Sequence, residues 1–175
     1  VHLITANTQL PVIDGITTTN VETAQQMSKV LEVEFPHADA LIMSAAIADA
    51  KVKNYRENKI SKDMLETLEL ESNQDILAML AKSKRTNQVI VGFAAETVSD
   101  LSKLELNAVS KLNSKSMDLI YVNDVSNGAV FGSDNTKGLI IDESENVTKV
   151  PEISKETLSE ILLDKLASKL VLSNG

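Results

Sequence analysis

The stretch Val89-Ile90-Val91-Gly92-Phe93-Ala94-Ala95-Glu96-Thr97 joins a short apolar run to small residues and a carboxylate. Two other runs end in the same way, Leu41-Ile42-Met43 before Ser44-Ala45-Ala46-Ile47-Ala48-Asp49 and Leu119-Ile120-Tyr121-Val122 before Asn123-Asp124-Val125. In open parallel sheets ligands bind outside the carboxyl ends of the strands, where small residues let them approach the backbone. The three endings therefore predict one shared binding site at one edge of a parallel sheet.

The rest of the chain alternates between helix and strand patterns. Apolar spacing predicts helices over residues 21–35, 99–114 and 156–172, the first capped by Asn20, and a short helix capped by Asn73 or Asp75. Strands are expected at residues 40–43, 88–93 and 118–122, an antiparallel strand or arm at 65–72, and a closing hairpin from 139–141 and 147–150. This order predicts a single α/β domain over residues 1–175: a doubly wound, mostly parallel, Rossmann-like three-layer sheet with an antiparallel hairpin or arm at about residues 51–72.

Composition narrows the functional classes. The 175 residues include no Cys, and only two histidines, His2 and His37, so neither disulfides nor a histidine metal cluster are expected, and the natural setting is the reducing cytoplasm. The net charge of −8 argues against nucleic acid as a partner. No apolar run approaches the roughly 20 residues that span a bilayer, so no membrane partner is expected.

One segment departs from the acidic average. Residues 51–63 carry two acidic side chains and five basic ones, Lys51, Lys53, Arg56, Lys59 and Lys62. A solvated loop or hairpin would explain the charges equally well, because charge runs are usually exposed faces. Its position after the first strand ending favours anion binding.

Two smaller patterns leave alternatives open. Tyr55 and Lys59 have the Tyr-x-x-x-Lys spacing of short-chain dehydrogenases, so an NAD(P)-dependent oxidoreductase fragment is an alternative. That spacing requires a helix, and neither an apolar stripe nor a Gly-x-Gly-x-x-Gly turn supports it. Asp49 offers a carboxylate to Mg²⁺ or to a ligand hydroxyl, although forming the turn is the simpler role. Glu96 carries the same ambiguity.

Seven blocks of residues occur in a recognisable order along the chain. They are Ser44-Ala-Ala-Ile-Ala-Asp49, Lys59-Ile60 with Lys62, Asn73-x-Asp75-Ile76, Gly92-Phe-Ala-Ala-Glu-Thr97, Lys111 with Lys115 ahead of Asp118-Leu-Ile120, Asn123-Asp124-Val125, and Phe131-Gly-Ser-Asp-Asn135. Together they resemble phosphopantothenoylcysteine synthetase. The form of residues 92–97 resembles the synthetase half of the bacterial bifunctional enzyme of coenzyme A biosynthesis, whose other half is a flavin-dependent decarboxylase.

The resemblance implies a ligase that joins 4'-phosphopantothenate to L-cysteine with CTP and Mg²⁺. It implies an acyl-cytidylate intermediate, with release of pyrophosphate and then of CMP. It also implies a homodimer and fusion to the decarboxylase half, and FMN is expected only in that half. Carried over by position, Lys59 is the essential lysine and Asp49 meets both substrate and metal. The binding positions form two sets, and Asp49 belongs to both. They are Ala45, Ala46, Asp49 and Asn123 for phosphopantothenate, and Asp49, Lys59, Gln74, Asp75, Ile76, Leu77, Phe93, Lys111 and Lys115 for the nucleotide.

Three departures from the family pattern qualify these expectations. Ser61 stands where the family has a lysine, and Gln74 stands where it has a proline. The Gly-rich turn and the essential Asn of the family do not occur after Val1, so we expect a chain truncated at its amino terminus and inactive by itself. A folding and dimerisation module, with the arm at residues 51–72 as the subunit contact, is therefore a further alternative.

Overall fold

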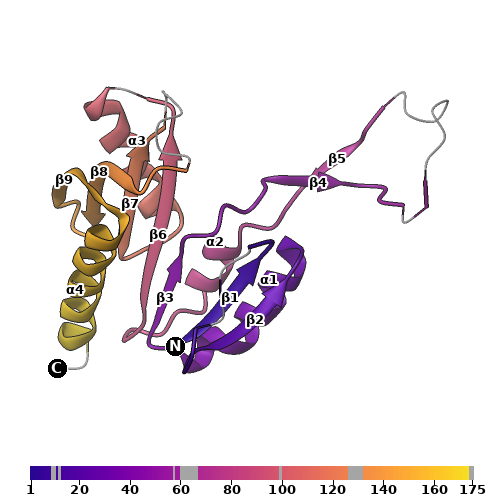
Figure 1. Cartoon of the computed structure of the whole chain (residues 1–175), viewed down its shortest axis with the longest axis horizontal. Coiled ribbons are helices and arrows are strands. Elements are labelled where there is room, and N and C mark those ends of the chain that lie inside the picture. The colour runs from indigo at the N-terminus through magenta and orange to yellow at the C-terminus, as the bar shows by residue number, and fades with distance from the viewer. Residues whose placement is uncertain are drawn as a thin grey trace. The chain divides into compact units, whose positions relative to one another are not determined.

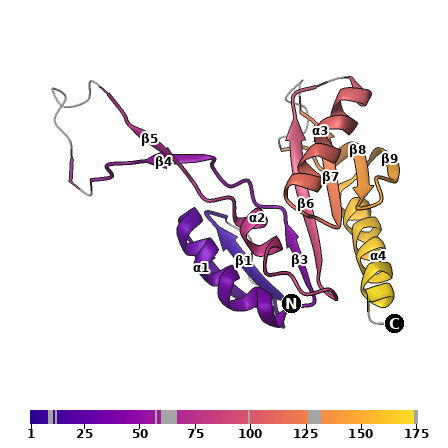
Figure 2. The same ribbon diagram turned by 180° about the vertical axis from the view of Figure 1, so that it is seen from behind.

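The computed structural model describes residues 1–8, 11, 13–56, 58, 59, 67–98, 100–125 and 132–173. The chain divides into two compact units, which are described separately. Unit 1 comprises Val1–Val30 and Ala46–Ile76, and unit 2 comprises Leu31–Ala45 and Leu77–Gly175. Figure 1 and Figure 2 show the elements of both units from opposite sides.

Unit 2 is built on a five-stranded sheet with the order β3-β6-β7-β8-β9. The strands are β3 (Ala40–Met43), β6 (Val89–Glu96), β7 (Leu119–Asp124), β8 (Asn135–Asp142) and β9 (Val147–Ser154). The neighbours β3, β6 and β7 are parallel, whereas β8 pairs antiparallel with β7 and with β9. In this sheet β8 alone therefore runs against the other strands. The predicted mostly parallel α/β sheet and its closing hairpin are confirmed.

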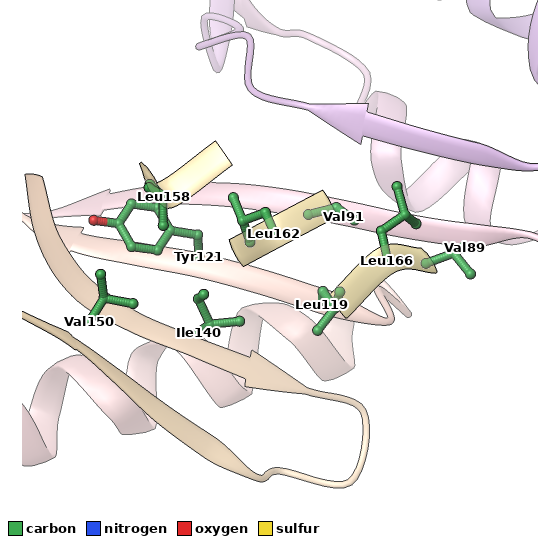
Figure 3. Packing of buried hydrophobic residues seen from close by; sticks show 9 residues of the cluster. All are labelled: Val89, Val91, Leu119, Tyr121, Ile140, Val150, Leu158, Leu162 and Leu166. Atoms are coloured by element: carbon green, nitrogen blue, oxygen red, sulfur yellow. The ribbon is translucent and has the colours of Figure 1, made fainter. Parts of the chain in front are cut away.

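Helices cover both faces of this sheet, as Figures 1 and 2 show. On one face, α4 (Lys155–Ser173) packs through Leu158, Leu162 and Leu166 onto Val89, Val91, Leu119, Tyr121, Ile140 and Val150 (Figure 3). On the other, α3 (Leu101–Ser114) buries Leu104, Ala108 and Leu112. Because successive side chains of a strand point to opposite faces, two covered faces require unbroken apolar runs. This explains the runs from which the strands were predicted.

Asp118 joins the start of β7 to β6. Its carboxylate accepts a hydrogen bond from the backbone N–H of Ile90 at 2.6 Å, and its other oxygen pairs with Lys84 Nζ, also at 2.6 Å. Its own backbone N–H donates to the Ile90 carbonyl at 2.9 Å. These contacts place the two strands in register, with Val91 opposite Leu119 and Glu96 opposite Asp124.

Unit 1 contains a parallel pair, β1 (His2–Ala6) and β2 (Thr17–Val21). The expectation that Asn20 caps the next helix is wrong, because Asn20 lies within β2 and α1 (Ala24–Glu34) begins later. The helix start is a capping box: the Thr23 hydroxyl accepts from the Gln26 N–H at 3.1 Å, and Gln26 Oε1 accepts from the Thr23 N–H at 3.0 Å. A short 3₁₀ turn, Phe35–His37, follows α1.

An antiparallel ribbon follows in unit 1, formed by β4 (Ala50–Val52) and β5 (Leu70–Ser72). All six of its residues are exposed. The ion pair Lys51–Glu71 at 3.3 Å joins its strands, and Lys53–Glu69 at 3.8 Å joins the residues just beyond them. This confirms an antiparallel element in the expected arm; residues 57 and 60–66 of that arm lie outside the described residues. The helix α2 (Ile76–Ala81) follows the ribbon, and all of it except Ile76 belongs to unit 2. Among the described residues, no helix is long and apolar enough to cross a membrane.

Candidate functional site

The three strands that precede the predicted endings lie side by side in the sheet of unit 2. The strands β3, β6 and β7 are adjacent and parallel, so their carboxyl ends meet at one edge. Met43 at the end of β3 pairs with Gly92, and β6 continues for four more residues to Glu96, which pairs with Asp124. The edge is thus stepped, with β6 and β7 extending beyond β3. This confirms the geometric part of the prediction, the common edge.

Phe93 lies on the α4 face of that edge. It packs against the core cluster, and its ring meets the ring of Tyr121 edge to face, with centroids 5.9 Å apart and planes at 69°. The Tyr121 hydroxyl is hydrogen-bonded to the Thr136 hydroxyl at 2.6 Å. Burial raises the pKa of Tyr121, and the bond to Thr136 offsets part of that rise. A neutral, buried tyrosine on the adjacent strand therefore packs beside Phe93.

Lys111 is held on the α3 face of the same edge. Its ammonium forms an ion pair with the carboxylate of Glu96, which also accepts a hydrogen bond from Asn107 Nδ2 at 3.2 Å. The Glu96 side chain is only 14% exposed, so its charge is largely removed from water. The helix that carries Lys111 begins at a good cap, because the Asp100 side chain accepts from the Ser102 N–H at 2.9 Å.

In unit 1, Asn73 holds the turn that contains Asp49. The Asn73 N–H donates to the Asp49 carbonyl and its Nδ2 donates to the Ala48 carbonyl, both at 2.8 Å. The expected role of Asn73 as a helix cap is therefore replaced by a clasp between residues 25 positions apart. Two of the seven blocks become neighbours through this clasp. The Asp49 side chain remains exposed.

The other predicted site residues differ in accessibility. Exposed positions are Ala45, Ala46, Lys59, Gln74 and Asp75, and partly buried ones are Lys115 and Asn123. Ile76 and Leu77 are 3% and 9% exposed, so their side chains belong to the core and only their backbone is available to a ligand. Ile60, Lys62 and Phe131 of the seven blocks lie outside the described residues.

Asp49 is the residue predicted to bind a metal ion. Within the described ranges, no three His, Cys, Asp or Glu side chains come together as a cluster that could hold a metal ion. Because Mg²⁺ prefers six oxygen ligands and keeps several waters, Asp49 fits as one ligand of a magnesium ion carried by phosphate groups.

Sequence reasoning did not identify the partner of Lys111 or the role of Asp118. Glu96 and Lys111 are 15 positions apart, and Lys84 and Asp118 are 34 apart, so no local pattern links them. It also gave no attention to Lys137 and Lys149, which line a cavity of unit 2. In the sequence, Lys149 lies in the predicted hairpin and Lys137 lies just before it, and no local pattern links the two.

Together, the stepped strand edge and the helices on both sheet faces define a Rossmann-like α/β domain. The chain belongs to the DNA/pantothenate metabolism flavoprotein C-terminal domain family, which matches residues 1–170. It is similar to the coenzyme A biosynthesis bifunctional protein CoaBC of Bacillus subtilis, with 36% identity over 150 residues that cover 85% of this chain and 36% of that protein.

Two further matches cover most of the chain. A protein named cysteine/cysteine sulfinic acid decarboxylase, from an unidentified prokaryote, is 33% identical over 164 residues, covering 93% of this chain and 44% of that one. The crystal structure of the C-terminal domain of a CoaBC protein matches with a TM-score of 0.77 and 26% identity, over 99% of this chain and 75% of that domain. The chain spans less than half the length of these two curated relatives. The resemblance based on the seven blocks, and the expected fold class, are confirmed.

Proposed function

We propose that this chain is the synthetase domain of an enzyme that ligates 4'-phosphopantothenate to L-cysteine with CTP. Family membership supports this, as does the similarity to proteins named for coenzyme A biosynthesis. The observation that carries the proposal is the common edge of β3, β6 and β7. The blocks beginning at Gly92 and Asn123 lie at the ends of β6 and β7, and the block beginning at Ser44 directly follows β3.

The chemistry explains why such an edge needs cations. A carboxylate becomes an acyl donor when its oxygen attacks the α-phosphorus of CTP, with pyrophosphate as the leaving group. The cysteine amine then attacks the carbonyl carbon of this acyl-cytidylate, and CMP leaves. Both substrates are anionic and the chain carries a net charge of −8, so the charge must be neutralised locally. Lys59 is assigned to the charge that develops in these steps, and Mg²⁺ to the phosphates, with Asp49 as one ligand.

Lys111 is suited to hold a nucleotide phosphate while it stays bound to Glu96. An ammonium has three N–H donors, and Glu96 Oε1 accepts one of them. Two donors therefore remain for phosphate oxygens. In this arrangement Glu96 is a positioning residue, and Lys115, one turn further along the chain, is the second cation assigned to the phosphates.

The oxidoreductase alternative loses its main support. Tyr55 and Lys59 do not lie in a helix, and Tyr55 is 77% exposed. The fixed, same-face geometry that a Tyr-x-x-x-Lys pair requires is therefore missing.

We assign the ribbon of β4 and β5 to contact with a second copy of the chain. Val52, Leu68 and Leu70 on or beside it are 36%, 61% and 60% exposed, which is apolar surface available for burial. Sedimentation equilibrium tests this: a dimer in the wild type that becomes a monomer in Leu68→Glu/Leu70→Glu supports it. A dimer that persists in this variant contradicts it, as does a monomeric wild type. A dimer that binds no nucleotide would favour the module alternative.

The ligase is tested with Lys59→Ala. Because activity of the whole protein is in question, the assay uses a chimaera in which this chain replaces the matching segment of the Bacillus subtilis relative. Removing one preorganised charge typically lowers the rate by about 10²–10³. Lys82→Ala, also exposed, is the control and should leave turnover unchanged. If the chimaera is active and its Lys59→Ala variant keeps the turnover within a few-fold, the role assigned to Lys59 is overturned. If the chimaera folds but forms no product, the proposed ligase activity is overturned.

A further inference from the structure

A cavity of about 440 Å³ lies in unit 2 between the start of α3 and the β8–β9 hairpin. Its lining includes Leu101 and Leu104 of α3, Leu139 and Lys137 of β8, and Lys149 of β9. Small-molecule sites are concave, largely apolar and about 300–1,000 Å³ in volume, with a few polar groups. The cavity meets these criteria.

This cavity is separate from the candidate nucleotide and substrate residues. None of the twelve residues assigned to those roles is in its described lining, and of the strand endings only Asp124 contributes to it. The contacts of Lys111 and Asn107 lead to Glu96 on β6, whereas six of the ten described lining residues of the cavity belong to β8 and β9.

A break in the β8–β9 ladder shapes one wall. Thr136 pairs with Ile153 and Gly138 with Val150, so one β8 residue, Lys137, faces two β9 residues, Pro151 and Glu152. Proline has no N–H to give to the ladder, and such irregularities redirect side chains and often occur beside binding sites. Both Lys137 and Pro151 line the cavity as a result.

The charges and apolar surfaces of the cavity indicate its ligand. Lys137 and Lys149 are exposed, and neither has an ion-pair partner within the described part of the chain. With Asp124, the charged lining residues sum to +1. Leu104 and Leu139 are 1% and 2% exposed and form an apolar floor, while Leu101 at the rim is 56% exposed.

We propose that this cavity binds a small amphipathic organic anion, with its anionic group near Lys137 and Lys149 and its apolar body against the three leucines. The proposal is independent of the ligase, because it uses none of the ligase residues. It assigns a function to two lysines that the strand-edge site leaves unused.

The probe for this test is 8-anilinonaphthalene-1-sulfonate, an aromatic anion that fluoresces when it leaves water. The wild type should bind one equivalent saturably. Lys137→Ala/Lys149→Ala should raise the dissociation constant of the probe by about tenfold, because two exposed charge contacts are lost. The matched control, Lys29→Ala/Lys82→Ala, removes two exposed lysines outside the lining and should bind as the wild type does. Equal affinity in the two double variants overturns the proposal.

A second measurement needs no variant. In ¹H–¹⁵N spectra of the wild type, the probe should shift the amide signals of Leu101, Gly138, Leu139 and Lys149 most strongly. Shifts centred on Phe93 and Lys111, or displacement of the probe by CTP, would place it at the strand edge and overturn the proposal. Fluorescence that rises without saturation would do the same, because it indicates nonspecific adsorption.

Discussion

The carboxylate of Glu96, the last residue of β6, forms an ion pair with the ammonium of Lys111 in the last turn of α3. This contact links the end of β6 to α3. The carboxylate is 14% exposed and the ammonium-bearing side chain is 44% exposed, so the pair is intermediate between a surface pair and a buried one. It fixes the position of a cation at the edge of the sheet before any ligand arrives.

We expect this pair to contribute measurably to stability. In a double-mutant cycle with Glu96→Gln and Lys111→Met, the coupling energy from urea unfolding should be about 0.5–1 kcal/mol. The control is the Lys51–Glu71 pair of the ribbon, whose side chains are 52% and 44% exposed. Because water screens both of its charges, its coupling should be smaller. A Glu96–Lys111 coupling energy no larger than that of the control pair would contradict a stabilising role for this ion pair.

Nucleotide preference is read from thermal shifts. A ligand that binds the native state raises the melting temperature in proportion to its binding free energy, so CTP should raise it more than ATP at equal concentration with Mg²⁺ present. Lys111→Met should reduce both shifts, because it removes a cation assigned to the phosphates. Equal or larger shifts with ATP would argue for an ATP-using enzyme.

Two glycines should differ in their tolerance of alanine. A Cβ at Gly138 would lie 2.1 Å from the backbone oxygen of Val122, whereas a Cβ at Gly92 would lie 2.1 Å from Met117 Sδ. A flexible side chain can move and a strand carbonyl cannot. We expect Gly138→Ala to cost about 3 kcal/mol in the free energy of unfolding and Gly92→Ala about 1 kcal/mol. Adding Met117→Leu should recover part of the Gly92→Ala loss, and a cost for Gly92→Ala as large as for Gly138→Ala would refute this reasoning.

The turn between β8 and β9 should make stability depend on pH in acid. Burial alone would raise the pKa of Asp142, but hydrogen bonds from Asn146 and Ser144 and the charge of Lys169 outweigh it and lower the pKa below 3.8. A lowered folded-state pKa gives a contribution that is fully present above the unfolded pKa and is lost as the pH falls through the folded one. The stability difference between wild type and Asp142→Asn should therefore be constant from about pH 7 to 5 and shrink below about pH 4. A difference that stays constant down to pH 2 would contradict this.

The fold class and the family could be read from the amino acids because their signals are local. Unbroken apolar runs at residues 89–91 and 119–122 mark strands covered on both faces, and the spacing of Leu158, Leu162 and Leu166 marks a helix with one buried stripe. The ends of the strands are less well predicted by the sequence. The strand expected to end at Phe93 continues to Glu96 because β7 pairs with it throughout, and β2 runs through Asn20 because it pairs with β1.

The chain's own residues thus specified the mostly parallel α/β class, the family and the existence of three similar strand endings. Their meeting at one edge depends on the order β3-β6-β7, which hydrogen bonds between distant strands establish. The pairing of Glu96 with Lys111, the clasp of Asn73 on Ala48 and the cavity beside Lys137 likewise exist only after folding. The physical reason is that the apolar pattern of a strand or helix is visible within a few consecutive residues. Ion pairs and strand-to-strand hydrogen bonds join groups that are far apart in the sequence and meet only after folding.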